Sequence, residues 1–297
     1  MNDIKVKPFL KWAGGKTSLI KEISFFYPFD DGIDVYIEPF LGGGAVLFDI
    51  LNKYNLKKVY VSDINKELIN VYNNLKYNVD ELIDSLEFIE NEYLLLSDEK
   101  RKEYYLKKRN EFNEIGISLK KSVLFIFLNK TCFNGLYRVN KKGEFNVPIG
   151  SYKKPVILDR ENLINISYKL KNVDIQVSDY KNCMKYINER TFVYFDPPYR
   201  PLSSTSSFTS YTNQNFDDLA QKELARFVEK IDKKNAKFLL SNSDPKNIDV
   251  NDNFFDDLYK DFYIKRVYTS RAINSKGSLR GKISEILVTN IDKEFYE

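Results

Sequence analysis

The sequence contains an acidic residue followed by two prolines and a tyrosine, Asp196, Pro197, Pro198 and Tyr199, directly after the apolar run 192–195. A carboxylate at the end of a buried parallel strand faces the crevice where such sheets bind ligands. The prolines lack N–H donors and keep the backbone extended, so the Pro197 carbonyl and the Asp196 carboxylate become two fixed acceptors. Such a pair can hold both hydrogens of an exocyclic amino group and aim its lone pair at an incoming methyl group. Tyr199 offers a ring for stacking on a base. A rigid turn with an Asp cap is the alternative, and four specific residues after a strand disfavour it.

A glycine cluster, Gly42 to Gly44, follows the apolar run 35–37 and the pair Glu38-Pro39. Glycines at this position let a ligand approach the backbone and present amides at a helix N-terminus. About twenty residues further on, Asp63 ends the next apolar run, where nucleotide-binding folds place an acid that bonds a ribose hydroxyl. Taken singly, the glycines fit a plain turn and Asp63 fits a helix N-cap. Their order together favours a nucleotide-like ligand.

The N-terminal residues 11–17 read Lys-Trp-Ala-Gly-Gly-Lys-Thr and invite comparison with a phosphate-binding loop. The spacing of that motif requires a glycine where Leu10 stands, and no strand is predicted before it. The sequence therefore offers only weak support for a nucleoside triphosphatase. Trp12 is the only tryptophan, and by itself it fits core packing.

Composition excludes several kinds of chemistry. The chain of 297 residues has no histidine, which rules out histidine triads, HExxH metal sites and histidine bases. Its two cysteines, Cys132 and Cys183, lack metal-ligand spacing and indicate a reducing compartment. The net charge of +4 says little about partners by itself. Without an apolar run of membrane-spanning length, we expect a cytoplasmic protein with no metal and no membrane partner.

Short apolar runs predict the strands that must position these groups: 35–37, 59–61, 175–177, 192–195, 238–240, 264–268 and 285–289. Several end in a polar or acidic residue, which is typical of a mostly parallel α/β sheet with its ligands at the carboxyl ends of the strands. Residues 67–170 differ, because they look helical to about Phe127 and then turn basic and rich in glycine and asparagine. We therefore predict one domain from residues 1–66 and 171–297, with 67–170 inserted.

With these residues assembled, the chain resembles the Dam family of DNA adenine-N6 methyltransferases, in particular the GATC-modifying enzymes of restriction–modification systems. The likeness runs from Pro8 to about Asn290. Its motifs are specific and in the family's order: KWAGGK at 11–16, EPFLGGGAV at 38–46, SDIN at 62–65, FNGLYRVNKKGEFNVPIG at 133–150, DPPY at 196–199 and PLSSTSSFTSY at 201–211. The order of donor loop, target-recognition insert and DPPY is that of the alpha group. The resemblance implies a Rossmann-like methyltransferase fold with a largely helical target-recognition insert.

The resemblance also implies a role for each matching residue. The contacts to the methyl donor, S-adenosyl-L-methionine, would be Trp12, Lys16, Phe40, Gly42, Asp63, Asp179, Tyr180 and Asp196. The catalytic group would be Asp196, Pro197 and Tyr199, with Phe208 or Tyr211 joining Tyr199 in stacking. The DNA-binding set would be Lys11, Phe133, Asn134, Leu136, Arg138 and Tyr152, with Phe133 as a wedge beside the target base. Where the family carries an Arg-Tyr pair this chain has Ser151-Tyr152, so one contact is lost or is supplied by Lys153 or Lys154.

The implied function is methylation of adenine N6 in GATC sites of double-stranded DNA after base flipping, without a metal or a covalent intermediate. A cognate restriction endonuclease on the same site would be its partner. Two alternatives remain open. A methyltransferase acting on RNA or on a protein amide can share the DPPY tetrad, although the basic segment around Arg138 favours duplex DNA. A DNA-binding protein with a decayed catalytic site would have lost Asp196 or the glycines, and both are present.

Overall fold

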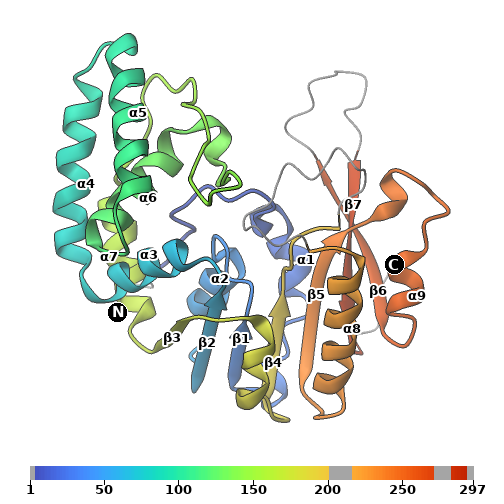
Figure 1. The fold of residues 1–297 in the computed structure, drawn as a ribbon. Coiled ribbons are helices and arrows are strands. Elements are labelled where there is room, and N and C mark those ends of the chain that lie inside the picture. The colour runs from blue at the N-terminus through green and yellow to red at the C-terminus, as the bar shows by residue number, and fades with distance from the viewer. Residues whose placement is uncertain (1–3, 201–215, 271–281, 293–297) are drawn as a thin grey trace.

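The computed structural model describes residues 4–200, 216–270 and 282–292, and in this part of the chain seven strands form one sheet (Figure 1). The sheet order is β3-β2-β1-β4-β5-β7-β6. Strands β1 to β5 pair in parallel, whereas β7 is antiparallel to both β5 and β6. The bounds are β1 Val35–Glu38, β2 Lys58–Asp63, β3 Val173–Val177, β4 Thr191–Phe195, β5 Lys237–Ser243, β6 Tyr263–Ser270 and β7 Lys282–Thr289. The predicted mostly parallel α/β fold is confirmed.

The order of the strands reverses between β1 and β4, which lie side by side with Ile37 opposite Val193. In open α/β sheets, ligands bind at such a reversal, outside the carboxyl ends of the strands. The loops that leave β1 and β4 therefore emerge next to each other at one edge. Strand β7 runs in the opposite direction, so its first half also reaches this edge, where Glu285 pairs with Ser243 at the end of β5.

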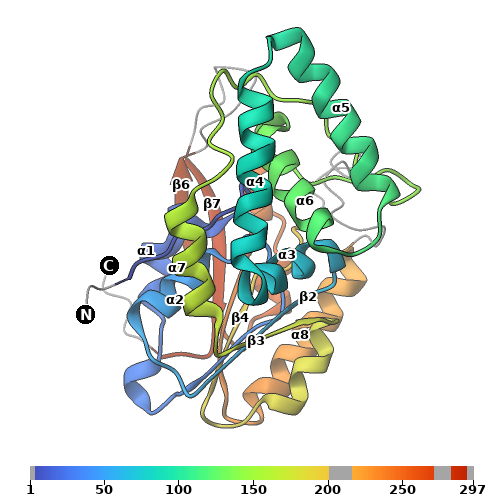
Figure 2. The ribbon, with the colours of Figure 1, turned by 90° about the vertical axis from the view of Figure 1, so that its left-hand side faces the viewer.

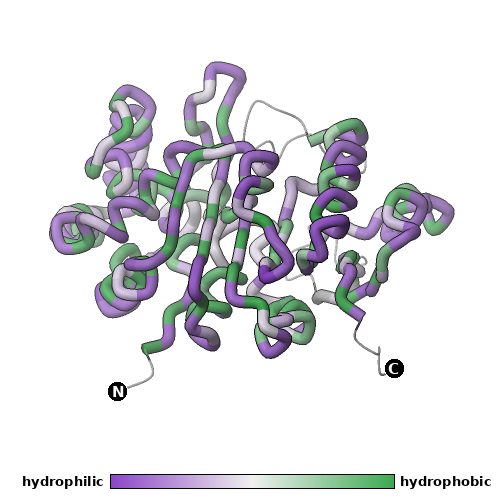
Figure 3. The backbone as a smooth tube through the Cα atoms, turned by 90° about the horizontal axis from the view of Figure 1, so that it is seen from below, coloured by the Kyte–Doolittle hydropathy of each residue, from purple (hydrophilic) through white to green (hydrophobic). Residues whose placement is uncertain are grey.

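Two helical layers cover the sheet, because successive strand residues point to opposite faces. Tyr36 and Phe192 pack on one face among residues of α1 (Ile20–Ser24), α2 (Ala45–Lys53) and α3 (Lys66–Tyr77). Ile37 and Val193 pack on the other face, against α8 (Asp218–Asp232) and α9 (Phe254–Leu258). Seen from below, the outer helices alternate between hydrophilic and hydrophobic stretches (Figure 3), as expected of helices that bury one side.

Four further helices stand together beside the β3 edge of the sheet (Figures 1 and 2): α4 (Val79–Leu94), α5 (Asp98–Glu114), α6 (Leu119–Thr131) and α7 (Arg160–Leu170). Helix α6 is buried on all sides in its middle, from Val123 to Asn129. One cluster of buried apolar residues runs from these helices through α3 into β1, β2 and β4. Helix α3 contacts both α6 and strands β2 and β3, so the proposed boundary at residue 67 falls in a helix shared by both parts.

A short hairpin connects α6 to α7 and contains the basic segment. Val139 and Phe145 form an antiparallel bridge, and the amide of Asn146 donates to the carbonyl of Arg138 at 3.1 Å. Gly143 closes the turn with a φ of 80°, which favours glycine. The sequence analysis identified this segment as basic and rich in glycine and asparagine. It did not predict that the segment folds as a hairpin. Among the described residues, no helix is both long and apolar enough to cross a membrane.

Candidate functional site

Lys16 lies at the centre of the candidate active site and is only 2% exposed. It begins the 3-10 helix η1 (Lys16–Leu19), and its Nζ lies 2.6 Å from Oδ1 of Asp196. The same ammonium donates to the hydroxyl of Tyr199 at 2.9 Å and to the carbonyl of Gly14 at 2.8 Å. The sequence predicted Lys16 as a contact of the methyl donor. The structure places it in direct contact with both predicted catalytic side chains.

Asp196 follows β4 and is also held by Ser241 of β5, whose hydroxyl donates to Oδ1 at 3.2 Å. Burial raises the pKa of the Asp196 carboxyl above its ordinary value, and Lys16 and Ser241 act against that rise. Within the described part of the chain, both contacts fall on Oδ1, so Oδ2 is the oxygen that a ligand can engage. Sequence reasoning missed Ser241, which directly follows the predicted strand 238–240.

The proline turn is held from behind by a buried amide pair. Gln221 of α8 is fully buried, and its Nε2 donates to the Pro198 carbonyl at 3.2 Å. Its Oε1 accepts from Nδ2 of Asn242, on β5, at 3.2 Å. Because the Pro198 carbonyl is already used, the acceptors left for an amino group are the Asp196 carboxylate and the preceding carbonyl, that of Pro197. No sequence motif pointed to Gln221.

The structure brings together three residues that are predicted to bind the methyl donor, Trp12, Gly42 and Asp63. The amide of Gly42 donates to Oδ2 of Asp63 at 3.1 Å. Gly42 has a φ of +48°, and a Cβ there would lie 2.8 Å from Nε1 of Trp12, so the indole rests directly on the glycine loop. The N-cap of α3 is Asn65, which frees Asp63 from that alternative role. Burial raises the pKa of the Asp63 carboxyl, against backbone hydrogen bonds that lower it.

Phe40 and Tyr180 form a stacked pair with ring centroids 5.3 Å apart. The amide of Ser178, just after β3, donates to the carbonyl of Asp63 at 3.1 Å, which places this pair beside the end of β2. The hydroxyl of Tyr180 is buried and has no hydrogen-bond partner among the described residues. Asp179 is exposed and accepts from the amide of Lys181. A polar ligand atom next to Tyr180 would therefore satisfy a buried group.

Glu38 ends β1 near the carboxylates of Asp63 and Asp196 and is 2% exposed. Its Oε2 accepts from the hydroxyl of Tyr36 at 2.8 Å. Burial, together with the nearby charges of Asp196 and Asp63, raises the pKa of this carboxyl well above 4.5. Glu38 belongs to the motif EPFLGGGAV, and no role was predicted for it.

We expect Glu38→Gln to be tolerated and to change how stability depends on pH. A carboxyl whose folded pKa is raised binds a proton that the unfolded chain releases. The wild type should therefore lose stability as pH rises from 4.5 through the folded pKa. The difference from Glu38→Gln should grow by about 1.4 kcal/mol per pH unit in that window. Urea unfolding of both proteins at a series of pH values measures it. Parallel curves would contradict the prediction, and Glu114→Gln, on an exposed site, is the matched control.

The predicted DNA-binding residues Lys11 and Tyr152 contact each other, with the Lys11 ammonium 3.8 Å from the centre of the Tyr152 ring. Buried Asn129 accepts from the amide of Lys11 at 2.9 Å. It donates to the carbonyls of Lys11 at 2.7 Å and Gly135 at 3.0 Å. A Cβ at Gly135 would collide with the Lys11 side chain. Asn129, which the sequence did not single out, thus joins the N-terminal segment to the loop after α6.

The loop after α6 and the hairpin that follows it carry the other residues predicted to contact DNA. Phe133 is 50% exposed, and Asn134 is exposed with a left-handed φ of 54°. Leu136 is partly buried. The Nε of Arg138 donates to Oδ1 of Asn146 at 2.8 Å across the hairpin, which fixes the plane of the guanidinium.

Tyr137, between two of the readers, connects the loop to the donor residues. Its ring stacks on Trp12 with centroids 6.0 Å apart and on Phe125 of α6 with centroids 5.2 Å apart. The motif at 201–211, with Phe208 and Tyr211, lies outside the described residues. In the described part of the chain, no group of three or more cysteine or acidic side chains is placed to hold a metal ion.

Comparisons with known proteins point in the same direction. Residues 12–273 match the family model described as D12 class N6 adenine-specific DNA methyltransferase. The type II methyltransferase M.MjaIII of Methanocaldococcus jannaschii is 51% identical over 294 residues, which cover 97% of this chain and 100% of that protein. M1.LlaDCHI of Lactococcus lactis is 38% identical, with 97% of each chain covered. The DNA adenine methylase of Escherichia coli K12 is 33% identical, with 95% of each covered.

Proposed function

The chain belongs to the D12 class of N6 adenine-specific DNA methyltransferases, and from that premise we propose that it transfers a methyl group from S-adenosylmethionine to adenine N6 in GATC sites of double-stranded DNA. One observation supports the proposal above all. The cluster of Lys16, Asp196 and Tyr199 lies at the reversal of the strand order, next to the glycine loop whose Gly42 amide bonds Asp63. A methyl acceptor and its donor would thus meet where two adjacent strands end.

The residues present fit the proposed donor. We assign its binding to Trp12, Gly42 and Asp63, with Phe40 and Tyr180 beside them. The left-handed glycine under the indole, the Asp63 carboxylate and the buried Tyr180 hydroxyl, which has no partner among the described residues, suit a ligand with a ring and several hydroxyls. Once bound, S-adenosylmethionine supplies an electrophilic methyl group on a positively charged sulfur.

The chain's own groups would orient and deprotonate the acceptor. Oδ2 of Asp196 and the Pro197 carbonyl would hold the two hydrogens of the adenine amino group, and the ring of Tyr199 would stack on the flipped base. Lys16 holds both Asp196 and Tyr199 in place. After methylation the nitrogen must lose a proton, and the raised pKa of Asp196 suits this carboxylate to accept it. Positioning and electrostatics would supply most of the acceleration.

The finer assignments extend this proposal. We propose the word GATC and a cytoplasmic location from the resemblance alone, and a partner endonuclease also because two relatives are named type II methyltransferase. We assign 67–170 as the inserted target-recognition domain, with 1–66 and 171–297 as the catalytic domain. The family model describes enzymes of DNA adenine, which disfavours RNA or a protein amide as the substrate.

Plasmid DNA from cells that express the protein tests the proposal directly. We expect N6-methyladenine at GATC when the plasmid is sequenced with modified-base detection, in a host that lacks its own adenine methylase. The same plasmid with Asp196→Ala is the control. Methylation at another word would contradict the GATC assignment, and unmodified adenine throughout would contradict the proposed activity.

Arg138→Ala should relax the reading of one base pair. An arginine held in one plane can bond guanine O6 and N7 together, and losing such a contact costs about 1–3 kcal/mol at one position. The measurement is the methylation rate on GATC and on each site with one base changed. Lys142→Ala, on the exposed hairpin turn, is the matched control and should weaken all sites alike. If Arg138→Ala also lowers every rate equally, Arg138 is not a base reader.

A further inference from the structure

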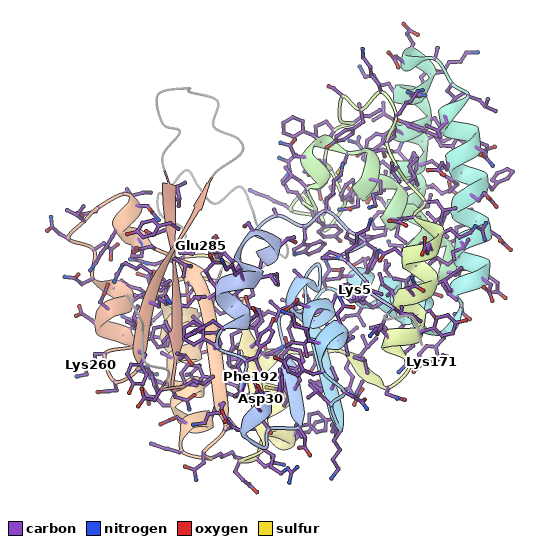
Figure 4. The ribbon with its side chains drawn as sticks, turned by 180° about the vertical axis from the view of Figure 1, so that it is seen from behind. Lys5, Asp30, Lys171, Phe192, Lys260 and Glu285 are labelled. Carbon is purple, nitrogen blue, oxygen red and sulfur yellow. The ribbon has the colours of Figure 1, made fainter. Side chains whose placement is uncertain are left out.

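Glu285 of β7 contacts the candidate catalytic group from a part of the chain that the sequence analysis assigned only to a strand. Its Oε2 accepts a hydrogen bond from the hydroxyl of Tyr199 at 2.7 Å. The same oxygen lies 3.8 Å from Nζ of Lys16. Its side chain is 17% exposed, so this carboxylate is mostly enclosed by protein. Glu285 appears at the catalytic edge near the ribbon of η1 and α1 in Figure 4.

The topology explains how a residue so late in the chain reaches this place. Strands β1 to β5 end at the catalytic edge, but β7 is antiparallel to β5 and therefore begins there. Glu285 pairs with Ser243, two residues beyond Ser241, which bonds Asp196. The two neighbouring strands thus hold the two predicted catalytic side chains separately. Strand β5 holds Asp196 through Ser241, and β7 holds Tyr199 through Glu285.

The hydroxyl of Tyr199 is bonded on two sides, since it accepts from Lys16 and donates to Glu285. A phenol oxygen with one donor and one acceptor partner on fixed elements cannot move away without losing a bond. Lys16 comes from η1 and Glu285 from the sheet, so the hydroxyl end of the ring is held in place relative to both. Lys16 lies between two carboxylates, which keeps its ammonium in place.

We propose that Glu285 is a positioning residue, which holds the Tyr199 hydroxyl so that the ring stands ready to stack on the target adenine. This inference rests on the proposed function. Glu285 does not touch the reacting atoms in it and acts only through Tyr199. A base held with a small error of placement reacts about 10²-fold more slowly, so loss of the tether should appear in the rate of the chemical step.

A double-mutant cycle tests the inference. Glu285→Ala and Tyr199→Phe each remove the same hydrogen bond, one by losing the acceptor and the other by losing the hydroxyl while keeping the ring. We expect each to lower the single-turnover rate of adenine methylation by about 10- to 100-fold and the double variant to be no slower than either. Donor affinity should stay within about threefold of the wild type. The inference would be overturned if the double variant lost rate by the product of the two single losses, or if either single variant kept the wild-type rate.

Glu285→Gln separates the hydrogen bond from the charge. Glutamine keeps an oxygen that accepts from the phenol, so we expect this variant to recover most of the wild-type rate. A rate as low as that of Glu285→Ala would overturn the tether. Should Glu285→Ala fail to fold, Glu285→Gln and Tyr199→Phe still decide.

Thr289→Val is the matched control for damage to β7. The Thr289 hydroxyl donates to the carbonyl of Phe238, far along the strand from the catalytic edge, and the residue is buried. We expect this variant to lose stability and to keep the wild-type rate. A wild type with no activity on adenine would refute the proposed function. An active wild type in which the rate losses of Glu285→Ala and Tyr199→Phe multiply in the double variant would refute only the role of Glu285.

Discussion

Replacing Asp196 with alanine should lower the rate of methyl transfer by on the order of 10²-fold or more. Oδ1 of Asp196 is bound by Lys16 and Ser241, so the carboxylate is fixed before any substrate arrives. We assign to Oδ2 the orientation of the amino group. Binding of duplex DNA should persist, because the predicted DNA-binding residues Lys11 and Arg138 do not contact Asp196 among the described residues. Single-turnover methylation and DNA binding, measured on the same preparation, check both parts.

Two companions make the Asp196 result specific. Asp196→Asn keeps the size of the side chain and one acceptor oxygen, but it removes the charge that faces Lys16, so we expect a large loss here as well. Asp174→Ala, on β3, removes an acid that accepts from Gln176 and lies outside the candidate site, and it should act like the wild type. A near-normal rate for Asp196→Ala would show that the catalytic assignment is wrong.

Asp63→Ala should weaken the binding of S-adenosylmethionine far more than the binding of DNA. A carboxylate that accepts from ribose hydroxyls contributes about 1.5–3 kcal/mol, or about 10- to 150-fold in the dissociation constant. The variant also leaves the Gly42 amide without its acceptor, which loosens the loop under Trp12. Both effects act in the same direction. Calorimetric titration of the donor measures the sum.

Asn65→Ala is the control for the Asp63 experiment. It removes the side-chain cap of α3, which accepts from the amide of Leu68 at 3.0 Å, and leaves the Asp63 carboxylate in place. This variant should lose about 1 kcal/mol of stability with little change in donor affinity. If Asp63→Ala binds the donor as tightly as the wild type, the ribose assignment fails. If Asn65→Ala weakens the donor equally, the effect belongs to the helix and not to the carboxylate.

The sequence predicted the strands, and it suggested the residues of the candidate site, because both leave local signals. Apolar runs that end in Glu38, Asp63 and Asp196 identify parallel strands and the groups at their carboxyl ends. Glycines and prolines mark loops whose backbone must take one conformation. All seven predicted strands are present in the structure.

The supporting residues could not be predicted, because their roles depend on pairings between distant segments. Gln221 and Asn129 are ordinary residues of helices, and only the packing of α8 and α6 brings their amides to Pro198 and Lys11. Glu285 requires knowing that β7 inserts between β5 and β6 and runs antiparallel. The role of Lys16 in the catalytic group was missed for the same reason, since Asp196 lies 180 residues further along the chain.

The single apolar core shared by the sheet and the helices beside it limits how this protein can acquire a new recognition sequence. Helix α6 is buried on all sides, and its cluster continues into β1 and β4. A segment such as 67–170 is therefore poorly suited to exchange between relatives as a unit, because the exchange would replace apolar residues that pack on one face of the sheet. In the turn of the hairpin, by contrast, Lys141, Lys142 and Glu144 are exposed. Divergence of specificity in this lineage should proceed by single replacements there, and engineering should begin at the same positions.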